Sequence, residues 1–310
     1  MTADREPPGG TASRAPSGAV VPDLLRRIVE RRQERLAEVR GGHPGLSVEA
    51  TPHLPATHPV PGLEPLTTRD NPFLAALTHH GRFGSPPPAG TPRQPAIIAE
   101  VKLGSPRLGS LVGRIDPLAQ ARLYAEHGAA ALSVVVEPDF FHGSYELLAD
   151  CRAASGLPAI AKDFVVDPLQ LAWARQAGAD AVLLIAALYE PEELARYAWL
   201  ARGLGLAPLI ETHDAADLAL LAGEPWELVG VNNRDLRTFE VDLERSIALL
   251  PSLPPGALKV AESGIRDALD AALLLDSGFD ALLVGESLLL AADPAAQLRA
   301  LLGRRDEGEA

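Results

Sequence analysis

From residue 96 onward, short apolar runs alternate with longer segments of helical periodicity, and this alternation limits the fold more than any other feature. The apolar runs have the length and composition of buried strands; they span residues 96–101, 131–136, 159–162, 181–185, 208–211, 229–232, 259–262 and 281–284. Helix-like segments separate several of them, at residues 118–127, 168–177, 191–203, 215–222 and 268–277. Strands that alternate with helices pair in parallel, because a parallel connection requires a crossover.

Eight such units predict an α/β fold, a (β/α)8 TIM barrel with an N-terminal helical extension. An open, doubly wound sheet is the alternative. That fold usually carries a glycine-rich phosphate turn after its first strand. Here the first strand is followed by Leu103-Gly104-Ser105-Pro106, so the closed barrel is the better interpretation.

The chain before the barrel has a different composition. Residues 1–22 are rich in Pro, Gly, Ala and Ser, which is typical of disorder. Asp23 then acts as an N-cap for a helix over 24–39, and the apolar stripe of this helix contains Leu25, Ile28, Val29, Leu36 and Val39. We divide the chain into a disordered tail at 1–22, an N-terminal helix and Pro-rich extension at 23–95, the barrel at 96–303 and a C-terminal tail at 304–310.

Composition excludes several classes of protein. The formal net charge is -13 and the predicted barrel has no basic cluster, so we expect no nucleic-acid partner. The first residues do not have the pattern of a signal peptide, and no apolar run approaches the ~18 residues of a membrane span. The single cysteine, Cys151, excludes an intrachain disulfide. We expect a cytoplasmic protein with no membrane partner, either a monomer or a weak homo-oligomer.

Lysine is rare in this sequence. Among 28 basic residues the lysines are Lys102, Lys162 and Lys259. Arginine cannot replace a compact ammonium group whose pKa can be tuned. Lys102 and Lys162 end predicted strands, where TIM barrels carry their active sites, whereas Lys259 begins one. We therefore predict a catalytic function for the first two only.

Polar residues follow most of the predicted strands. These residues are Glu100, Lys102, Glu137, Lys162, Asp163, Glu211, Asn232, Asn233, Arg234, Glu262, Ser263 and Glu286. Charged groups deep in a barrel cost several kcal/mol unless they are paired or contact a ligand. Lysines and glutamates at one mouth neutralise one another and stay available for proton transfer. A purely structural salt-bridge network is the alternative, but barrels usually carry stability at the opposite rim.

A glycine comes after each of the last two predicted strands, at Gly264 and Gly285. Glycines there let backbone N–H groups approach an anion, at the phosphate site common in this fold. The pair predicts a phosphorylated small-molecule substrate.

Seven segments at strand ends, or in the loops after them, carry a resemblance to a known family. They are Ile98–Lys102 with Ser105-Pro106, Phe140–Ser144, Lys162–Phe164, Glu211–Asp214, Gly230–Leu236, Ala261–Ile265 and Leu283–Glu286. Through these segments the barrel, from about residue 74 to residue 303, resembles indole-3-glycerol phosphate synthase, the ring-closing enzyme of tryptophan biosynthesis. The helix over 24–39 is similar to that family's N-terminal extension, which lies across the barrel mouth.

The resemblance implies a reaction. The substrate is 1-(o-carboxyphenylamino)-1-deoxyribulose 5-phosphate; its aromatic ring attacks the ketone carbon, carbon dioxide leaves, and water is eliminated. By similarity, Lys162 is the acid that protonates the ketone oxygen and Glu211 is the base. Lys102 pairs with the substrate carboxylate and is an acid in the dehydration. The resemblance implies no metal or organic cofactor.

The resemblance also implies roles for other residues. Glu100 and Asn232 position the departing hydroxyl, and Ser263 and Glu262 complete the polar floor. Contacts are implied to the phosphate for Ser105, Gly264, Gly285 and, through its backbone N–H, Glu286; to the anionic groups for Arg234; and to the anthranilate ring for Phe141 and Phe164.

The first loop departs from the family's pattern. Leu103 stands where the family usually has a second lysine, Arg107 and Leu108 replace a serine and a lysine, and Val136 replaces a common threonine. The loop thus loses two lysines and gains one arginine. This change affects phosphate affinity and loop motion rather than the reaction.

Two other functions stay open. One is a lysine-dependent, aldolase-type barrel enzyme that forms a Schiff base through Lys162. The other is a catalytically inactive barrel that binds a phosphorylated ligand or a partner protein. Phosphoribosylanthranilate isomerisation is disfavoured, because that family uses a cysteine base at the end of the first strand, where this chain has Glu100.

Overall fold

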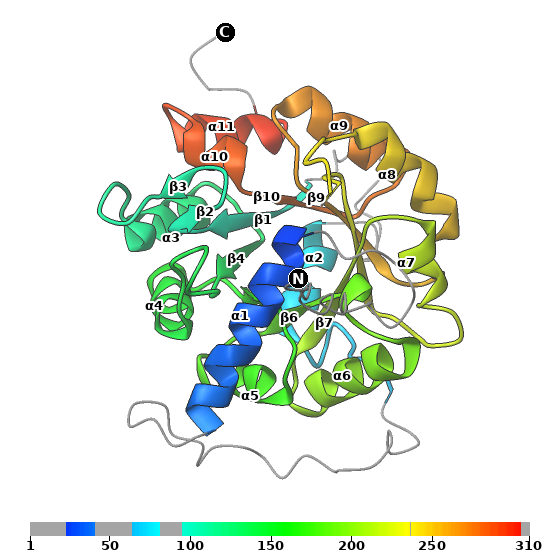
Figure 1. The fold of residues 1–310 in the computed structure, drawn as a ribbon. Coiled ribbons are helices and arrows are strands. Elements are labelled where there is room, and N and C mark those ends of the chain that lie inside the picture. The colour runs from blue at the N-terminus through cyan, green and yellow to red at the C-terminus, as the bar shows by residue number, and fades with distance from the viewer. Residues whose placement is uncertain (1–22, 41–63, 81–94, 236, 305–310) are drawn as a thin grey trace, which may run out of the picture.

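A computed structural model describes residues 23–40, 64–80, 95–235 and 237–304, and its centre is a closed barrel of parallel strands (Figure 1). The barrel strands are β1 (Ala96–Val101), β4 (Ala131–Val135), β5 (Ala159–Lys162), β6 (Ala181–Ile185), β7 (Ala207–Thr212), β8 (Leu228–Asn232), β9 (Leu258–Glu262) and β10 (Ala281–Val284). β1 closes the barrel by pairing with both β4 and β10. The loop after β1 holds a short hairpin of β2 (Gly104–Ser105) and β3 (Gly109–Ser110). The predicted TIM barrel is confirmed, and each predicted strand overlaps an observed one.

Helices form the outer ring (Figure 1). The helical elements after β1 are α3 (Pro117–Glu126), α4 (Tyr145–Ser155), α5 (Pro168–Gln176), η2 (Ala186–Leu188), α6 (Pro191–Gly203), α7 (Ala215–Ala219), α8 (Leu243–Leu249), η3 (Leu250–Ser252), α9 (Ala268–Ser277), α10 (Glu286–Leu290) and α11 (Pro294–Leu301). Aspartate side chains cap the first turns of α3, α5, α7, α8, α9 and α11 by accepting backbone N–H groups, which fixes where these helices begin. The structure adds α4, α8 and α10 to the predicted helices.

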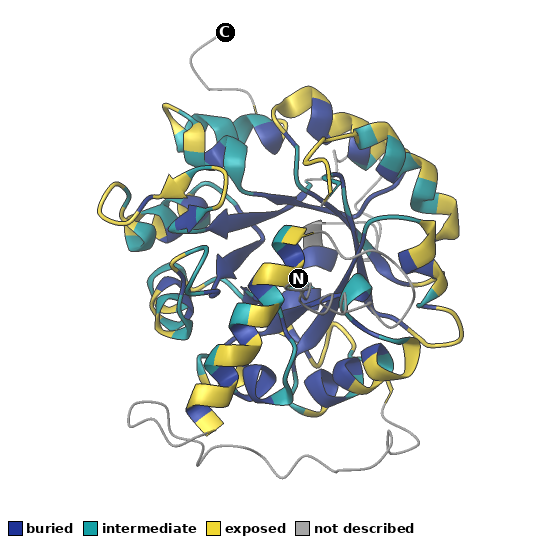
Figure 2. Cartoon of the chain, viewed as in Figure 1, coloured by how far each residue is buried: buried dark blue, intermediate teal, exposed yellow. Residues whose placement is uncertain are grey.

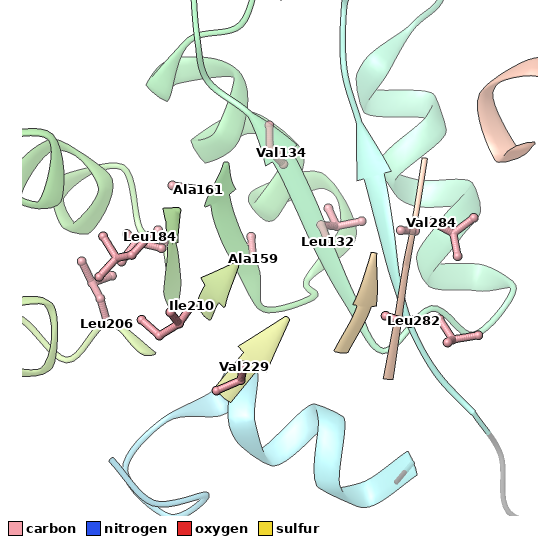
Figure 3. Packing of buried hydrophobic residues seen from close by; sticks show 14 of the residues in the cluster. Leu132, Val134, Ala159, Ala161, Leu184, Leu206, Ile210, Val229, Leu282 and Val284 are labelled. Carbon is pink, nitrogen blue, oxygen red and sulfur yellow. The ribbon is translucent and has the colours of Figure 1, made fainter. Parts of the chain in front are cut away.

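The alternation of side chains along each strand separates two apolar cores. In β1, Ala96 and Ile98 belong to the inner core, on the barrel axis, while Ile97 and Ala99 belong to the outer core, between strands and helices. Figure 2 shows buried strands inside helices that expose one face, and Figure 3 shows labelled side chains of the outer core. The next inward position of β1 is Glu100. The inner core is therefore apolar until the carboxyl ends of the strands.

Helix α2 (Pro72–His80) closes the amino end of the barrel. Its apolar side chains in the inner core are Phe73, Leu74 and Leu77. The Asn71 side chain accepts the first backbone N–H groups of α2 and donates to the carbonyls of Asp180 (2.7 Å) and Gly205 (3.0 Å). This helix fills one end, so the opposite end is where a ligand can enter.

Helix α1 (Asp23–Arg40) lies across the carboxyl end of the barrel (Figure 1). Its buried residues are Leu25, Ile28, Arg32, Leu36 and Val39. The predicted apolar stripe is thus confirmed with one change, because Val29 is only half-buried and Arg32 occupies a buried position. A buried guanidinium requires an anionic partner.

That partner is Asp163, directly after β5. Arg32 meets it with two guanidinium nitrogens, Nε lying 3.1 Å from Oδ1 and Nη2 contacting Oδ2. Tyr145 and Gln170 also donate to Oδ2, over 2.8 and 2.9 Å. One turn further along α1, Arg35 makes two 2.9 Å hydrogen bonds to Asp139. Ion pairs therefore fasten α1 to the loops after β4 and β5.

Other predicted features lie outside the described residues: the tail at 1–22, most of the Pro-rich extension before residue 95 and nearly all of the C-terminal tail at 304–310. The division of the chain into parts therefore stays a prediction. None of the helices in the described ranges is long and apolar enough to cross a membrane.

We predict that Arg32→Ala lowers the free energy of unfolding by about 3 to 5 kcal/mol, because it leaves the Asp163 carboxylate buried without its cation. Urea denaturation measures this value. Arg27→Ala, at an exposed position of the same helix, is the matched control and should change stability by less than about 0.5 kcal/mol. Equal losses in the two variants would contradict the structural role of the buried pair.

Candidate active site

A cavity of about 450 Å³ opens at the carboxyl end of the barrel, under α1. The predicted site residues that line it are Glu100, Lys102, Ser105, Phe141, Lys162, Phe164, Glu211, Asn232, Arg234, Ser263, Gly264, Gly285 and Glu286. They come from the ends of most barrel strands and from the loops after them. The structure thus brings together every predicted site residue except Glu262, which lies behind the lining.

One ion pair joins Glu100 and Lys102. These residues occupy positions i and i+2 at the end of β1, so they share a face, and Nζ lies 2.5 Å from Oε1. Burial alone would raise the pKa of Glu100, but the charges of Lys102 and Lys162 and the Lys102 hydrogen bond together outweigh it and lower the pKa. Gly285 leaves room for this carboxylate, since a Cβ there would lie 2.3 Å from Glu100 Oε1. The Glu100–Lys102 pair at the end of β1 therefore depends on Gly285, which follows the neighbouring strand β10.

A second group centres on Lys162, at the end of β5. Its Nζ lies 3.1 Å from Glu262 Oε2 and 3.7 Å from Glu211 Oε2. Burial would lower the pKa of Lys162, but the two carboxylates outweigh it and raise the pKa above the usual range. The ammonium is therefore charged before any ligand binds.

The two carboxylates beside Lys162 differ from each other. Burial raises the pKa of Glu262 to about 7 even though Lys162 opposes the shift. Burial also acts on Glu211, but the close contact with His213 and the Lys162 charge together outweigh it and bring its pKa to about 2. Glu211 is therefore the stronger acid of the two, and Glu262 holds a proton more readily.

Glu262 is the one predicted site residue that does not line the cavity. Its side chain is fully buried and contacts Lys162, so its contact with the substrate stays a prediction. Gly230 makes this position possible, because a Cβ there would lie 2.0 Å from Glu262 Oε1. Glu262 acts on the cavity through Lys162.

Sequence reasoning gave no role to His213, although it lies in one of the matched segments. Its Nε2 is 3.1 Å from Glu211 Oε1, and its Nδ1 is 3.1 Å from Asp217 Oδ2. The signal was present in the sequence: His213 follows Glu211 by two residues at the end of a strand, so the two side chains share a face.

Two arginines of the cavity lining, Arg107 and Arg234, lie close to Glu286. Arg107, from the hairpin after β1, contacts Glu286 Oε1, and Arg234 Nη2 lies 3.6 Å from Glu286 Oε2. Nearby, Ser263 and Gly264 both have positive φ, 66° and 75°. For a serine this backbone conformation is uncommon, and it often marks a site that approaches a ligand. This side of the cavity combines positive charge with backbone in a conformation that favours glycine.

Aromatic and aliphatic side chains cover the remaining wall. Phe141 and Phe164 lie with ring centroids 6.0 Å apart at 35°. The α1 residues that line the cavity are Leu24, Leu25 and Ile28. Leu25 and Ile28 belong to the predicted apolar stripe of this helix, but none of the three was among the predicted site residues.

Glu137 is at a strand end but has a different function. It accepts backbone N–H groups from Asp139, Phe140 and Phe141 over 2.7 to 3.0 Å and does not line the described cavity. Its carboxylate therefore shapes the loop that carries Phe141. Across the described ranges, no group of three or more His, Cys, Asp or Glu residues could hold a metal ion.

Gly285→Ala tests the packing beneath the first ion pair. The added methyl group displaces Glu100 from Lys102, so we expect a loss of roughly 10-fold or more in kcat/KM and about 1 to 3 kcal/mol of overpacking strain. Gly203→Ala is the control, because a Cβ at this last residue of α6 meets no atom within 4 Å. Steady-state kinetics and thermal unfolding measure both effects; unchanged kinetics in Gly285→Ala would rule out the close contact.

Comparisons with known proteins agree with this geometry. The family model described as indole-3-glycerol phosphate synthase matches residues 89–301. A relative of that name from Chlorobium phaeobacteroides is 47% identical over 197 residues, which cover 64% of this chain and 76% of the relative. Another from Rhodopirellula baltica is 46% identical over 209 residues, covering 67% of this chain and 81% of the relative.

Solved structures agree on the fold alone. The 3-hexulose-6-phosphate synthase of Salmonella typhimurium superposes with a TM-score of 0.54 at 14% identity, covering 67% of this chain and 97% of its own. The orotidine 5'-phosphate decarboxylase of Pyrococcus horikoshii gives a TM-score of 0.51 at 16% identity, covering 66% and 97%.

Proposed function

The chain belongs to the indole-3-glycerol phosphate synthase family, and we propose that its cavity closes the indole ring of 1-(o-carboxyphenylamino)-1-deoxyribulose 5-phosphate with loss of carbon dioxide and water. One observation carries the proposal. Lys102 and Lys162 line the same cavity, and each contacts a buried glutamate. Two acids in one cavity suit a reaction that protonates the same oxygen twice, first as the ketone oxygen and then as the departing hydroxyl.

In the ring-closing step, Lys162 is the acid. As the aromatic ring carbon attacks the ketone carbon, negative charge develops on the ketone oxygen, and the Lys162 ammonium transfers a proton to it. Carbon dioxide then leaves and restores the aromatic ring. The substrate carboxylate, which departs in this step, pairs with Lys102 beforehand.

In the dehydration step, the hydroxyl formed from the ketone leaves as water. Lys102 supplies the proton that the hydroxyl needs, and the Glu211 carboxylate removes a proton from the adjacent carbon, so the charges balance. Glu100 and Asn232 position the departing hydroxyl, and Ser263 adds a polar group to the floor.

The rim holds the rest of the substrate. The phosphate contacts Ser105 and the backbone N–H groups of Gly264, Gly285 and Glu286, while Arg234 supplies positive charge. The anthranilate ring packs against Phe141 and Phe164, which already lie close together. The carboxylate of Glu286 repels a phosphate, but Arg107 and Arg234 both contact it and offset its charge.

An aldolase-type function is less compatible with this site. A lysine that forms a Schiff base needs a lowered pKa so that its amine is neutral. In Lys162 burial is outweighed by Glu262 and Glu211, and the pKa rises instead. Borohydride with a ketose phosphate therefore should trap no adduct. The inactive-barrel alternative is disfavoured by the complete set of acids and bases.

The remaining expectations are proposals of the same kind. We propose a cytoplasmic enzyme that needs no metal or organic cofactor, does not bind nucleic acid or membranes, and is a monomer or a weak homo-oligomer. Light scattering tests the oligomeric state, and full turnover in the presence of EDTA tests whether a metal is needed.

Lys162→Ala is the decisive variant. Removing the acid should lower kcat by about 10²- to 10⁴-fold, measured as indole fluorescence after adding the carboxyphenylamino-deoxyribulose phosphate. Lys259→Ala is the matched control, because Lys259 lies near the start of β9, at the end of the barrel away from the cavity, and should retain normal turnover. Full activity in Lys162→Ala would refute the assignment, and an inactive wild type that still binds the substrate would favour the inactive barrel.

A further inference from the structure

His213 lies behind Glu211, outside the cavity lining, and the proposed mechanism gives it no role. We infer that His213 is a positioning residue: held as an imidazolium by Asp217, it fixes the Glu211 carboxylate and keeps it ionised through the reaction. The inference rests on the proposed function, because it assumes that Glu211 is the base.

The local fold explains how His213 is held. It follows β7 directly, and Asp214 caps the first turn of α7 by accepting the backbone N–H groups of Ala216 and Asp217. This turn brings Asp217 back toward the strand end. Asp217 Oδ2 then accepts the backbone N–H of His213 over 2.8 Å and lies 3.1 Å from its Nδ1. Two contacts to one oxygen fix the orientation of the ring.

The same orientation fixes the protonation state. Nδ1 faces Asp217 and Nε2 faces Glu211, each 3.1 Å from a carboxylate oxygen. A neutral imidazole carries one N–H and one lone pair, so it would direct a lone pair at an anion. Only the doubly protonated ring avoids this. The Nε2 contact lies off the direction of a hydrogen bond, so its attraction is chiefly that of opposite charges.

The pKa values of His213 and Glu211 agree with a doubly protonated ring. Burial alone would lower the pKa of His213, but Asp217 and Glu211 outweigh it and raise the pKa to about 10. In return, the close contact and charge of His213 help to bring the pKa of Glu211 to about 2 despite burial.

The surroundings of Glu211 show why a second cation matters. The charged and polar groups that act on Glu211 or share its floor are Lys162 from β5, Glu262 from β9, Glu100 from β1, Asn232 from β8 and His213. The two glutamates oppose its ionisation, and Lys162 favours it from the Oε2 side. Once Lys162 has given its proton to the ketone oxygen, that favourable charge is gone. His213, on the Oε1 side, keeps its proton and remains in contact.

The imidazolium can be observed directly. In wild-type protein labelled with ¹⁵N, both ring nitrogens of His213 should carry protons at pH 7.5, a signal assigned by its loss in His213→Asn. A neutral His213 ring at that pH overturns the inference. This measurement needs no substrate, so it remains valid even if the proposed reaction is wrong.

Kinetics tests the consequence. His213→Asn should lower kcat by about 10- to 100-fold with KM changed less than about threefold, and it should move the acidic limb of the kcat profile to higher pH. The limb moves to higher pH because the variant loses a cation beside Glu211. This loss raises the pKa of Glu211, so less of it is ionised at low pH. Asp217→Asn should lower kcat most at high pH, where the released imidazole loses its proton.

His127→Asn is the matched control, because His127 ends α3 on the outer ring and its Nδ1 contacts only the Leu123 carbonyl among the contacts described for its ring. It should keep the wild-type profile. A His213→Asn enzyme with normal kcat, or one whose loss is confined to thermal stability or KM, overturns the inference while active wild-type enzyme leaves the proposed function intact. An inactive wild type points instead to failure of the proposed function.

Discussion

Lys162 carries its positive charge into the interior of the barrel, and the arrangement of the floor follows from that charge. A buried ammonium is tolerated only with anionic partners, and two glutamates supply them. Two carboxylates at one cation repel each other, which separates their proton affinities and leaves Glu262 as the weaker acid. The same contacts that stabilise the folded barrel therefore also set which group is an acid and which is a base. Gly230 is required by this arrangement, because any side chain there would displace Glu262.

The N-terminal helix is connected to the same floor. Asp163 directly follows Lys162 in the chain and is the partner of Arg32 in α1. The helix that covers the cavity is thus fastened next to the residue that acts inside it, and the apolar residues of α1 complete the cavity wall. A closed apolar cover strengthens the electrostatic interactions beneath it, because it excludes water. Arg32 of the cover, Tyr145 and Gln170 are all hydrogen-bonded to Asp163, which is the neighbour of the acid in the chain.

The sequence was sufficient for the barrel and for most of the cavity, because both follow from local rules. Strand periodicity gave the strands, and the residue that ends a parallel strand is necessarily at the mouth. Contacts between distant parts of the chain could not be predicted in this way. Glu262 ends a strand like its neighbours, but its side chain lies outside the cavity lining, in space left by Gly230 on the adjacent strand. Arg32 was not part of the predicted apolar stripe, since its partner Asp163 lies 131 residues away. His213 differs from these, because its spacing from Glu211 is visible in the sequence, whereas its contact with Asp217 depends on how α7 begins.

The first loop illustrates how the chain can depart from the family pattern without a change in chemistry. Leu103 follows Lys102 and does not line the cavity within the described ranges, so a lysine there would not join the floor. Arg107 does line the cavity, at the rim, where it and Arg234 share Glu286. Two guanidinium groups against one carboxylate leave an excess of positive charge at the rim, and burial and then the charge of Arg107 lower the pKa of Arg234. A phosphate dianion relieves that repulsion. The floor, by contrast, pairs its lysines with glutamates. The cavity therefore separates a balanced region suited to proton transfer from a positive region suited to anchoring the substrate.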